Sequence, residues 1–421
     1  MKVISQSSKK SIIFGIMIFY LLYYPPFFKI NTLYIIGFFS WGYIFLNYNT
    51  FRLIFRNYML KKFYFIWGVI IIWGCIVVKI HDESISNSAG PIFWLMVIVP
   101  SSIIIGNYYK KREKGEYDLL DLILKIGVIQ GITAILALLF PYIKNFFLEM
   151  VYSKDVLDNI LVYALDHRLY GYATGLTFGT PIVQAYLTMI ALYLFINKNV
   201  KYALYVPILA FSAIINARSA VVIFALCFIL ILIFSEKNVK TIKRIILTIL
   251  LCIIGILSGV ILMNMLSPQT VEWVYTGIKE IFNFLKGDMK EGYFSYVVNP
   301  ENLFLPSGGG LIWGRGIRTL NANKYNLLSD IGYINDIWFG GIVYCIVVYS
   351  VIIYLIRSII RKVKETDSTF YLRKFLLWSF LLGTFILNVK MYVISLNGFS
   401  TLLIMIIILF GSYPRFCENE C

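Results

Sequence analysis

Long runs of apolar residues, separated by shorter polar stretches, fill most of the chain. A helix needs about 20 largely apolar residues to cross the hydrocarbon layer of a membrane. Runs that approach this length recur from one end of the chain to the other and predict about twelve transmembrane helices. Their approximate ranges are 11–28, 31–47, 63–80, 91–106, 119–142, 180–196, 202–216, 218–235, 245–266, 334–356, 375–389 and 392–412. We therefore expect an all-α polytopic membrane protein in which residues 1–421 form a single integral membrane domain.

Composition supports the same class. Hydrophobic residues make up 59% of the chain and charged residues 14%, and the mean hydropathy is +0.78. A soluble domain of this length could not cover so much apolar surface. The first apolar run follows the basic stretch Met1–Lys10, as in a signal peptide, but no small-residue cleavage site comes after it. We interpret this run as the first transmembrane helix.

Lysine and arginine residues predict the orientation. They concentrate in every second connecting segment, namely those after the second, fourth, sixth, eighth and tenth predicted helices, and before the first helix. The positive-inside rule places such segments in the cytoplasm, so both termini are expected there. The net charge of +16 then reflects membrane topology and attraction to anionic lipid headgroups. We expect no nucleic-acid partner.

Three segments stand apart on the predicted outer side. They are a loop over residues 143–179, a tight turn over 216–219 and a larger loop over 267–332. The larger loop begins with apolar residues at helical spacing over 271–285, which predict an interfacial helix that contacts the membrane surface or packs over the bundle. A glycine- and arginine-rich stretch, 307–318, follows.

Glycines in this stretch could bind an anion through the backbone. Gly308, Gly309, Gly310, Gly314 and Gly316 give a flexible chain with accessible N–H groups, which can surround a phosphate. Ordinary turn glycines in a surface loop are an equally good interpretation, because glycine-rich patterns alone are weak signals.

Three outer arginines are candidates for binding a diphosphate: Arg168, Arg218 and Arg315. Arginine donates two parallel hydrogen bonds from a planar group and stays charged at all relevant pH. Arg218 opens a predicted helix directly after a tight turn, so it could instead extend toward lipid headgroups. Arg318 lies outside this proposed set, and its replacement by lysine is expected to have a milder effect.

A carboxylate could accept a proton from a sugar hydroxyl. Asp330 is the leading candidate, and a helix cap or an ion pair with an arginine is its alternative role. Asp336, near the start of a predicted helix, is a weaker candidate. His81 and His167 are far apart in the chain, and no metalloprotease, nucleotide-binding or nucleophile-elbow motif is present.

Cysteines give no sign of a cofactor site. Four of the six lie in predicted transmembrane helices and two lie in the C-terminal tail, so neither a disulfide framework nor a cysteine metal site is indicated. We expect no metal and no cofactor.

Several of these segments resemble the superfamily of O-antigen ligases and polymerases, including capsular polysaccharide polymerases of the Wzy type. Arg168 and Gly179, with ten residues between them, are similar to an outer-loop arginine motif of the polymerases. A second similarity is a short motif at the start of one transmembrane helix in that superfamily, which resembles Asn216-Ala217-Arg218-Ser219-Ala220. Trp313-Gly314-Arg315-Gly316, followed by Asp330-Ile331-Gly332-Tyr333, resembles the end of its large outer loop.

The resemblance implies a metal-independent, inverting glycosyltransferase. Such polymerases move a growing glycan from undecaprenyl diphosphate to the terminal sugar of another lipid-linked repeat, on the outer side of the bacterial cytoplasmic membrane. In these terms Arg168, Arg218 and Arg315 would bind the diphosphate, and Asp330 and Arg218 would be catalytic. A chain-length regulator and a flippase would be possible partners, beside membrane lipid.

Two features bear on the alternatives. A second arginine–ten-residue–glycine motif is missing, because Asn326 and Ser329 stand at that distance from Arg315 and Arg318. The related ligases carry a functional histidine in the large loop, and residues 267–332 contain none, which favours a polymerase over a ligase. A repeat-unit flippase remains an alternative, although few charges interrupt the predicted helices and the outer loops are long.

Overall fold

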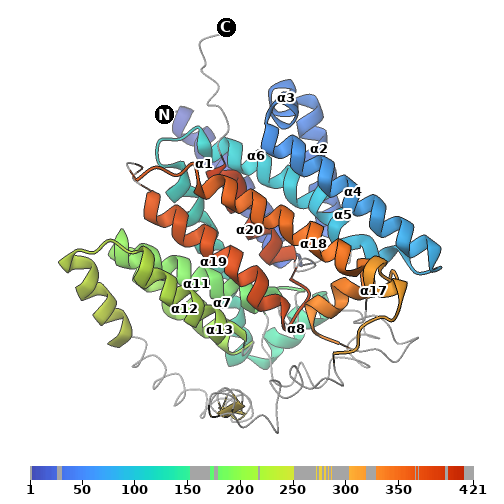
Figure 1. Cartoon of the computed structure of the whole chain (residues 1–421). Helices are drawn as coiled ribbons and strands as arrows, with labels where there is room; N and C mark the ends of the chain where they lie inside the picture. Colours follow the sequence, from blue (N-terminus) through green and yellow to red (C-terminus); the bar gives the residue numbers. More distant parts are fainter. Residues whose placement is uncertain are drawn as a thin grey trace. The chain divides into compact units, whose positions relative to one another are not determined.

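The structure is a computed structural model, and it describes residues 2–25, 31–151, 171–174, 179–216, 219–250, 272, 275–276, 279–280, 283, 286, 303–318, 329–365, 367, 369–393 and 397–411. Within these ranges all regular secondary structure is helical, as the apolar pattern predicts (Figure 1). Most of the two long outer loops, including the predicted interfacial helix over 271–285, lies outside the described residues or is described only at isolated positions.

Six described segments are long and apolar enough to cross a membrane. They are Tyr58–Ile80 (α4), Ile85–Lys110 (η1 to α6), Gly115–Leu139 (α7), Gly179–Asn197 (α11), Gly332–Ile360 (α18) and Phe370–Asn388 (α19). Five shorter apolar helical segments are Lys10–Tyr23 in α1 (Lys2–Tyr23), Thr32–Leu46 (α2), Val200–Ile214 (η3 and α12), Ala220–Phe234 in α13 (Ser219–Phe234) and Asn397–Phe410 (α20). Each coincides with a predicted transmembrane helix. The count of twelve remains a prediction, because the run 245–266 is described only as far as residue 250.

Further helices lie where the apolar pattern predicts connections or one continuous run. The described residues add α3 (Tyr48–Arg56) and α8 (Pro141–Val151), and they divide the segment before Lys110 into η1 (Ile85–Ser88), α5 (Ala89–Phe93), η2 (Trp94–Ile98) and α6 (Val99–Lys110). Asn57 separates α3 from α4, because its side chain accepts hydrogen bonds from the N–H groups of Met59 and Leu60 and so caps α4.

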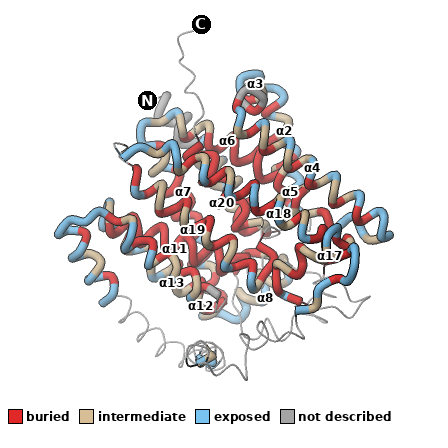
Figure 2. The backbone as a smooth tube through the Cα atoms, in the orientation of Figure 1, coloured by how far each residue is buried: buried red, intermediate tan, exposed pale blue. Residues whose placement is uncertain are grey.

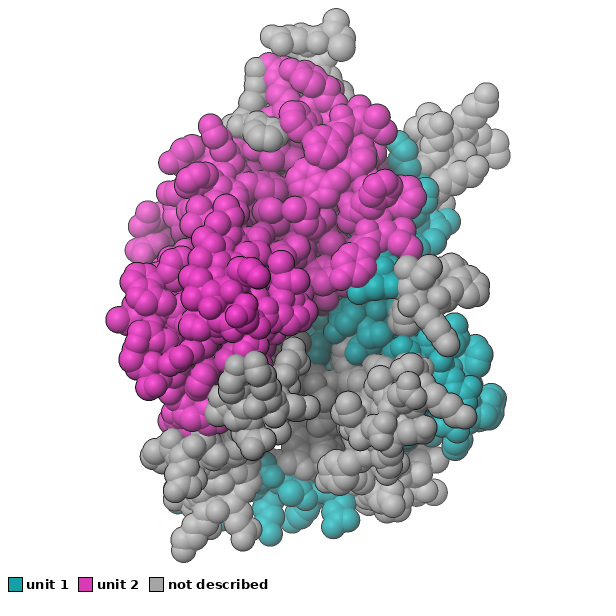
Figure 3. All heavy atoms as spheres, turned by 90° about the vertical axis from the view of Figure 1, so that its right-hand side faces the viewer, with its two compact units in different colours: residues 1–32, 121–302 teal, residues 33–120, 303–421 magenta. Residues whose placement is uncertain are grey.

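The chain divides into two compact units (Figure 3). Unit 1 contains Met1–Thr32 and Asp121–Asn302, and unit 2 contains Leu33–Leu120 and Leu303–Cys421. Both units combine segments that are far apart in the sequence, and the boundary near residue 120 falls inside α7.

Helix α11 forms the core of unit 1. All of its residues from Gly179 to Ile196 are buried (Figure 2), and it packs against α1, α12 and α13. Gln184, fully buried in this helix, donates hydrogen bonds from Nε2 to the Tyr23 hydroxyl at 3.1 Å and to the Gly127 carbonyl at 3.0 Å. One polar side chain thereby joins α1, α7 and α11, since a buried amide needs partners inside the protein.

In unit 2, α18 packs against α4 and α19, and α20 packs against α6 and α19. Helix α18 is broken at Gly341, which has φ 76° and ψ −179°. The kink leaves three carbonyls before it available for hydrogen bonds from outside the helix. Trp338 O accepts from Arg315 N at 2.7 Å, Phe339 O accepts from Gly316 N at 3.0 Å, and Gly340 O accepts from the Trp73 indole at 3.3 Å. These bonds satisfy backbone groups that would be costly to leave free in a membrane protein.

Replacing Gly341 with alanine is expected to destabilise the protein by about 1–3 kcal/mol through the backbone conformation alone. An added Cβ would also lie 2.0 Å from the carbonyl oxygen of Ile312. Thermal unfolding in detergent would measure the loss. Gly68 in α4 is the matched control, because an added Cβ there meets nothing within 4 Å, and Gly68→Ala should leave stability unchanged or slightly higher. A Gly341→Ala protein that melts like the parent would contradict this account of the kink.

Several helix ends that carry basic residues meet at one end of unit 2. Lys62 Nζ, near the start of α4, lies 4.4 Å from the centre of an aromatic ring near the end of α18. Arg373 at the start of α19 pairs with Glu116 at the start of α7. Lys110 at the end of α6 donates to the Gly411 carbonyl just after α20. These are the ends that the charge pattern predicts to face the cytoplasm.

Labelling of single cysteines tests this orientation. In a chain whose native cysteines are replaced, Ser307→Cys and Ser153→Cys should react with a membrane-impermeant thiol reagent in intact cells, because both lie in predicted outer loops. Ser368→Cys should react only after the cells are permeabilised. Labelling of Ser368→Cys in intact cells would overturn the predicted topology. Of the three positions, the structure describes Ser307, which is exposed.

Candidate functional site

The sequence-predicted site residues divide into two groups. Arg168 and Arg218 lie outside the described residues. Arg315, Asp330 and the loop glycines Gly308, Gly309, Gly310, Gly314 and Gly316 are described, and all belong to unit 2. The structure therefore leaves the predicted convergence of three arginines as a prediction.

The short piece after Arg168 packs tightly in unit 1. An added Cβ at Gly171, which has φ +64°, would lie 2.4 Å from Thr133 Oγ1 and 2.9 Å from Ala134 N. Thr174 donates from its hydroxyl to the carbonyl of Tyr24 at 2.7 Å. The backbone at Gly171 therefore approaches α7 closely, which a residue with a Cβ would prevent.

Three of the five loop glycines already use their backbone N–H groups in hydrogen bonds within the protein. Gly308 precedes the short helix α17 (Gly309–Trp313), in which Gly310 N donates to Ser307 O at 3.2 Å. Gly314 N donates to Gly310 O at 2.9 Å, and Gly316 N is already bound to α18. These three N–H groups could reach an anion only by giving up existing bonds. At these three positions the backbone is therefore a poorer anion donor than an arginine side chain.

Two of these glycines are required by close approach. An added Cβ at Gly314 would lie 2.5 Å from Phe339 O, and one at Gly316 would lie 2.8 Å from Val78 Cα. Both residues also have positive φ, at 85° and 71°, which favours glycine. The stretch is therefore wedged between α18 and the end of α4.

Arg315 is half-buried, and its guanidinium is weakly engaged. An added Cβ at Gly310 would meet the Arg315 side chain, which folds back over that glycine, and Arg315 Nη2 donates to Ser307 O at 3.4 Å. Among the described residues it has no ion-pair partner. A ligand could therefore recruit this cation without displacing any carboxylate of the described part of the chain.

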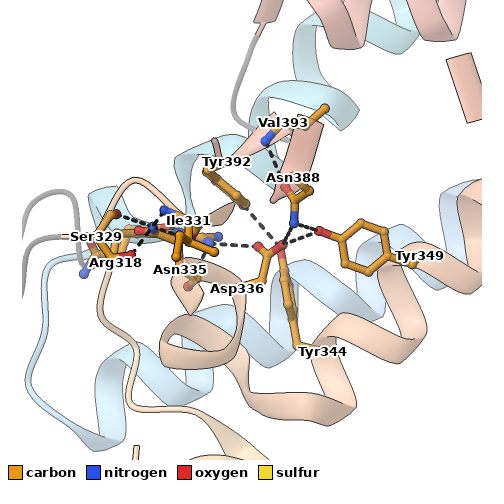
Figure 4. A network of polar contacts seen from close by, with 11 residues as sticks. Arg318, Ser329, Ile331, Asn335, Asp336, Tyr344, Tyr349, Asn388, Tyr392 and Val393 are labelled. Atoms are coloured by element: carbon orange, nitrogen blue, oxygen red, sulfur yellow. Dashed lines mark hydrogen bonds and ion pairs between the residues drawn. The ribbon is translucent and has the colours of Figure 1, made fainter. Parts of the chain in front are cut away.

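Arg318, three residues later, has the opposite environment. It is 5% exposed, and its Nη1 lies 3.1 Å from Asp336 Oδ1 (Figure 4). Its Nε donates to Asn87 O at 3.3 Å, and Nη1 also donates to Asn335 O at 3.4 Å. Its guanidinium carbon lies 3.9 Å from the ring centres of both Phe339 and Tyr392, which adds cation–π attraction in a desolvated setting.

Arg318 is a buried cation that its neighbours compensate. Burial by itself would lower the pKa of the Arg318 guanidinium, but Tyr392, Tyr344 and Asp336 together hold that pKa above its ordinary value. A buried cation of this kind is tolerated because it has a carboxylate partner and several acceptors.

Asp336 is the centre of the network. It is fully buried in the second turn of α18, and its Oδ2 accepts from the Tyr349 hydroxyl at 2.6 Å and from Asn388 Nδ2 at 3.4 Å. Asn388 also donates to the Tyr349 hydroxyl, and its Oδ1 accepts from Val393 N at 3.1 Å. The pair formed by Arg318 and Asp336 is thus connected to both α18 and the end of α19.

Asp330 lies beside this network on an exposed part of the chain. The residues on either side of it, Ser329 and Ile331, are buried, and Ile331 N donates to Ser329 Oγ at 3.2 Å. Asp330 is therefore held by buried neighbours while its own side chain is accessible, as a proton acceptor for a substrate would need to be.

Sequence reasoning underestimated the residues of this network. Arg318 was expected to be peripheral and Asp336 was a secondary candidate, and Asn335, Tyr349 and Asn388 were not considered. One signal was available, because a carboxylate inside an apolar run requires a partner, and Arg318 is among the nearest cations before it in the chain. The buried contacts now predict a large effect, rather than a mild one, for changes at Arg318.

The described residues contain no group of three His, Cys, Asp or Glu side chains close enough to hold a metal ion. Comparison of the chain with models of protein families, with curated proteins and with solved structures found no match. The function is therefore argued from the residues and their geometry.

Proposed function

We propose that the protein is a polymerase of undecaprenyl-diphosphate-linked oligosaccharide repeat units in the bacterial cytoplasmic membrane. The observation that carries the proposal is the arrangement at the start of α18. Two stretches that resemble the polymerases, 313–316 and 330–333, border this part of α18, the first through the bonds of Arg315 and Gly316 to its backbone. Arg315 and Asp330, an accessible arginine and an accessible carboxylate, thus both lie near the start of α18 in unit 2.

The distribution of charge supports an outer location for this region. The start of α4 lies at the basic end of unit 2, whereas Gly316 packs on Val78 near the other end of that helix. If the basic end faces the cytoplasm, Arg315 and Asp330 belong to the outer side. Lipid-linked repeat units are polymerised on that side of the membrane.

The proposed reaction transfers a glycan between two lipid-linked molecules. The acceptor hydroxyl attacks the anomeric carbon of the donor sugar, the bond to the diphosphate breaks, and Asp330 takes the hydroxyl proton. Arg168, Arg218 and Arg315 stabilise the negative charge that develops on the undecaprenyl diphosphate leaving group. Arg315 is suited to this role because no carboxylate among the described residues neutralises it.

A transporter is less well supported. Charged residues in the interior of transport helices generally serve substrates or ions. In the described candidate membrane helices, the carboxylates away from the helix ends are already paired: Asp336 with Arg318, and Asp121 with Lys125 at 2.8 Å and Lys201 at 2.9 Å. Neither carboxylate is therefore left without a cationic partner for binding a coupled ion.

Deletion of the gene, followed by gel analysis of the surface glycan, tests the proposal. Loss of polymerase activity leaves single repeat units on the cell surface, whereas loss of a flippase removes exported repeats altogether. A ladder of normal length in the deletion strain would refute the proposed function.

A further inference from the structure

Arg318 and Ser329, which flank residues 319–328 in the sequence, are bound to the same residue. Arg318, directly before the segment, donates from Nη1 to the backbone carbonyl of Asn335 at 3.4 Å. Ser329, directly after it, accepts from the side-chain Nδ2 of Asn335 at 2.8 Å. Arg318 and Ser329 are therefore both attached to α18 through Asn335, which is fully buried.

The anchor is reinforced from a second helix. Arg318 also pairs with Asp336, whose other carboxylate oxygen is bound by Tyr349 and by Asn388 at the end of α19. Asn335 Nδ2 makes a further bond to Ile331 O at 3.0 Å. The position of Arg318 is thus defined by several directional bonds, each of which is lost if the side chain moves.

The residues on either side of this anchor are the two accessible candidate groups. Arg315 lies three positions before Arg318 in the sequence, and its backbone N–H donates to Trp338 O. Asp330 follows Ser329 directly, between two buried residues. Fixing Arg318 and Ser329 to Asn335 therefore fixes where Arg315 and Asp330 leave the protein core.

We propose that Asn335, Asp336 and Asn388 are positioning residues that hold Arg315 and Asp330 at a defined separation for glycan transfer. The role of that separation in glycan transfer rests on the proposed polymerase function. A buried ion pair is a poor source of net stability, because a well-packed apolar pair of similar volume is often equally stable. Its directional geometry is what an apolar pair cannot replace.

The double variant Arg318→Met/Asp336→Leu separates geometry from stability. It removes the ion pair without leaving a buried charge, so the protein should accumulate in the membrane and melt close to the parent. Spin labels at Ile312→Cys and Asp330→Cys, in a chain without native cysteines, should give one narrow distance in the parent. In the double variant that distance distribution should broaden.

Glycan transfer by the unlabelled double variant, reconstituted with lipid-linked repeat units, gives the second measurement. The maximal rate per molecule should fall at least tenfold, and up to about a hundredfold, because a displacement of 1 Å at a reacting group can have that effect. The matched control is Arg373→Met/Glu116→Leu, which removes a partly buried pair at the basic end of the same unit. It should keep both the narrow distance and the parental rate.

Each combination of distance and rate either supports or overturns the proposal. A broadened distance with a reduced rate supports the proposal, whereas a distance that stays narrow, or a parental rate in spite of broadening, overturns it. If the double variant does not accumulate, Asn335→Ser replaces it, since serine is too short to reach Ser329 and should broaden the distance in the same way. If the parent transfers no glycan, the proposed function fails, while the distance measurement still decides whether the anchor exists.

Discussion

Replacing Asp336 alone with leucine is expected to lower the free energy of unfolding by about 3–5 kcal/mol, because a buried cation is then left without its partner. Arg318 is 5% exposed and surrounded by aromatic rings, so water cannot easily replace the lost carboxylate. Thermal unfolding in detergent, together with the amount of protein in the membrane, would measure the effect.

Adding Arg318→Met to this variant should restore most of the lost stability, since the uncompensated charge is removed with it. Glu116→Leu is the comparison at the other end of unit 2. Its partner Arg373 also reaches Asp367 at 3.5 Å and is more exposed, so the loss should be much smaller. An Asp336→Leu protein that melts like the parent would show that Arg318 finds another partner.

Replacing Arg218 with lysine is expected to abolish long glycan while leaving the amount of protein nearly normal. Lysine keeps the positive charge but loses the planar pair of donors that fits a diphosphate. Losing one strong contact to charge that develops in the transition state should slow transfer by about a hundredfold or more. The length of the surface glycan, measured by gel electrophoresis in a deletion strain that carries the variant, is the readout.

Arg357→Lys provides the control, because Arg357 is exposed at the basic end of α18 and should tolerate the change. Normal polymerisation by Arg218→Lys would remove Arg218 from the diphosphate site and indicate a topological anchor. A loss of the protein from the membrane would indicate a structural role instead.

The apolar pattern predicts the helices well because burial in lipid imposes a length and a composition. For α18, the predicted range 334–356 lies inside the observed Gly332–Ile360. Local irregularities were not predictable in this way. The run 91–106 is largely apolar and predicts one regular helix, yet it contains a π turn over Trp94–Ile98. Gly341 likewise interrupts a run that the sequence predicts as one continuous helix.

The candidate site was predictable only in part, because sequence motifs identify residue types but not their partners. Arg315 and Arg318 look alike in the sequence, and only the fold shows that one is accessible while the other is buried against Asp336. The loop glycines were recognised as special, but for a different reason. Gly314 and Gly316 allow the backbone to touch α18 and α4, which no local pattern could distinguish from an anion-binding loop.

The kink at Gly341 also determines how α18 fits the thickness of a bilayer. The helix has 29 residues, and a straight helix of that length would measure about 43 Å, well beyond a hydrocarbon layer of about 30 Å. The part after the kink, residues 342–360, measures about 28 Å and matches that layer by itself. If that part spans the layer, the part before the kink, with Asp336, lies at the depth of the headgroups, where a charged pair costs less than in hydrocarbon. Lipids with longer acyl chains would draw the pair toward the apolar layer, so hydrophobic mismatch acts directly on the region that holds Arg315 and Asp330.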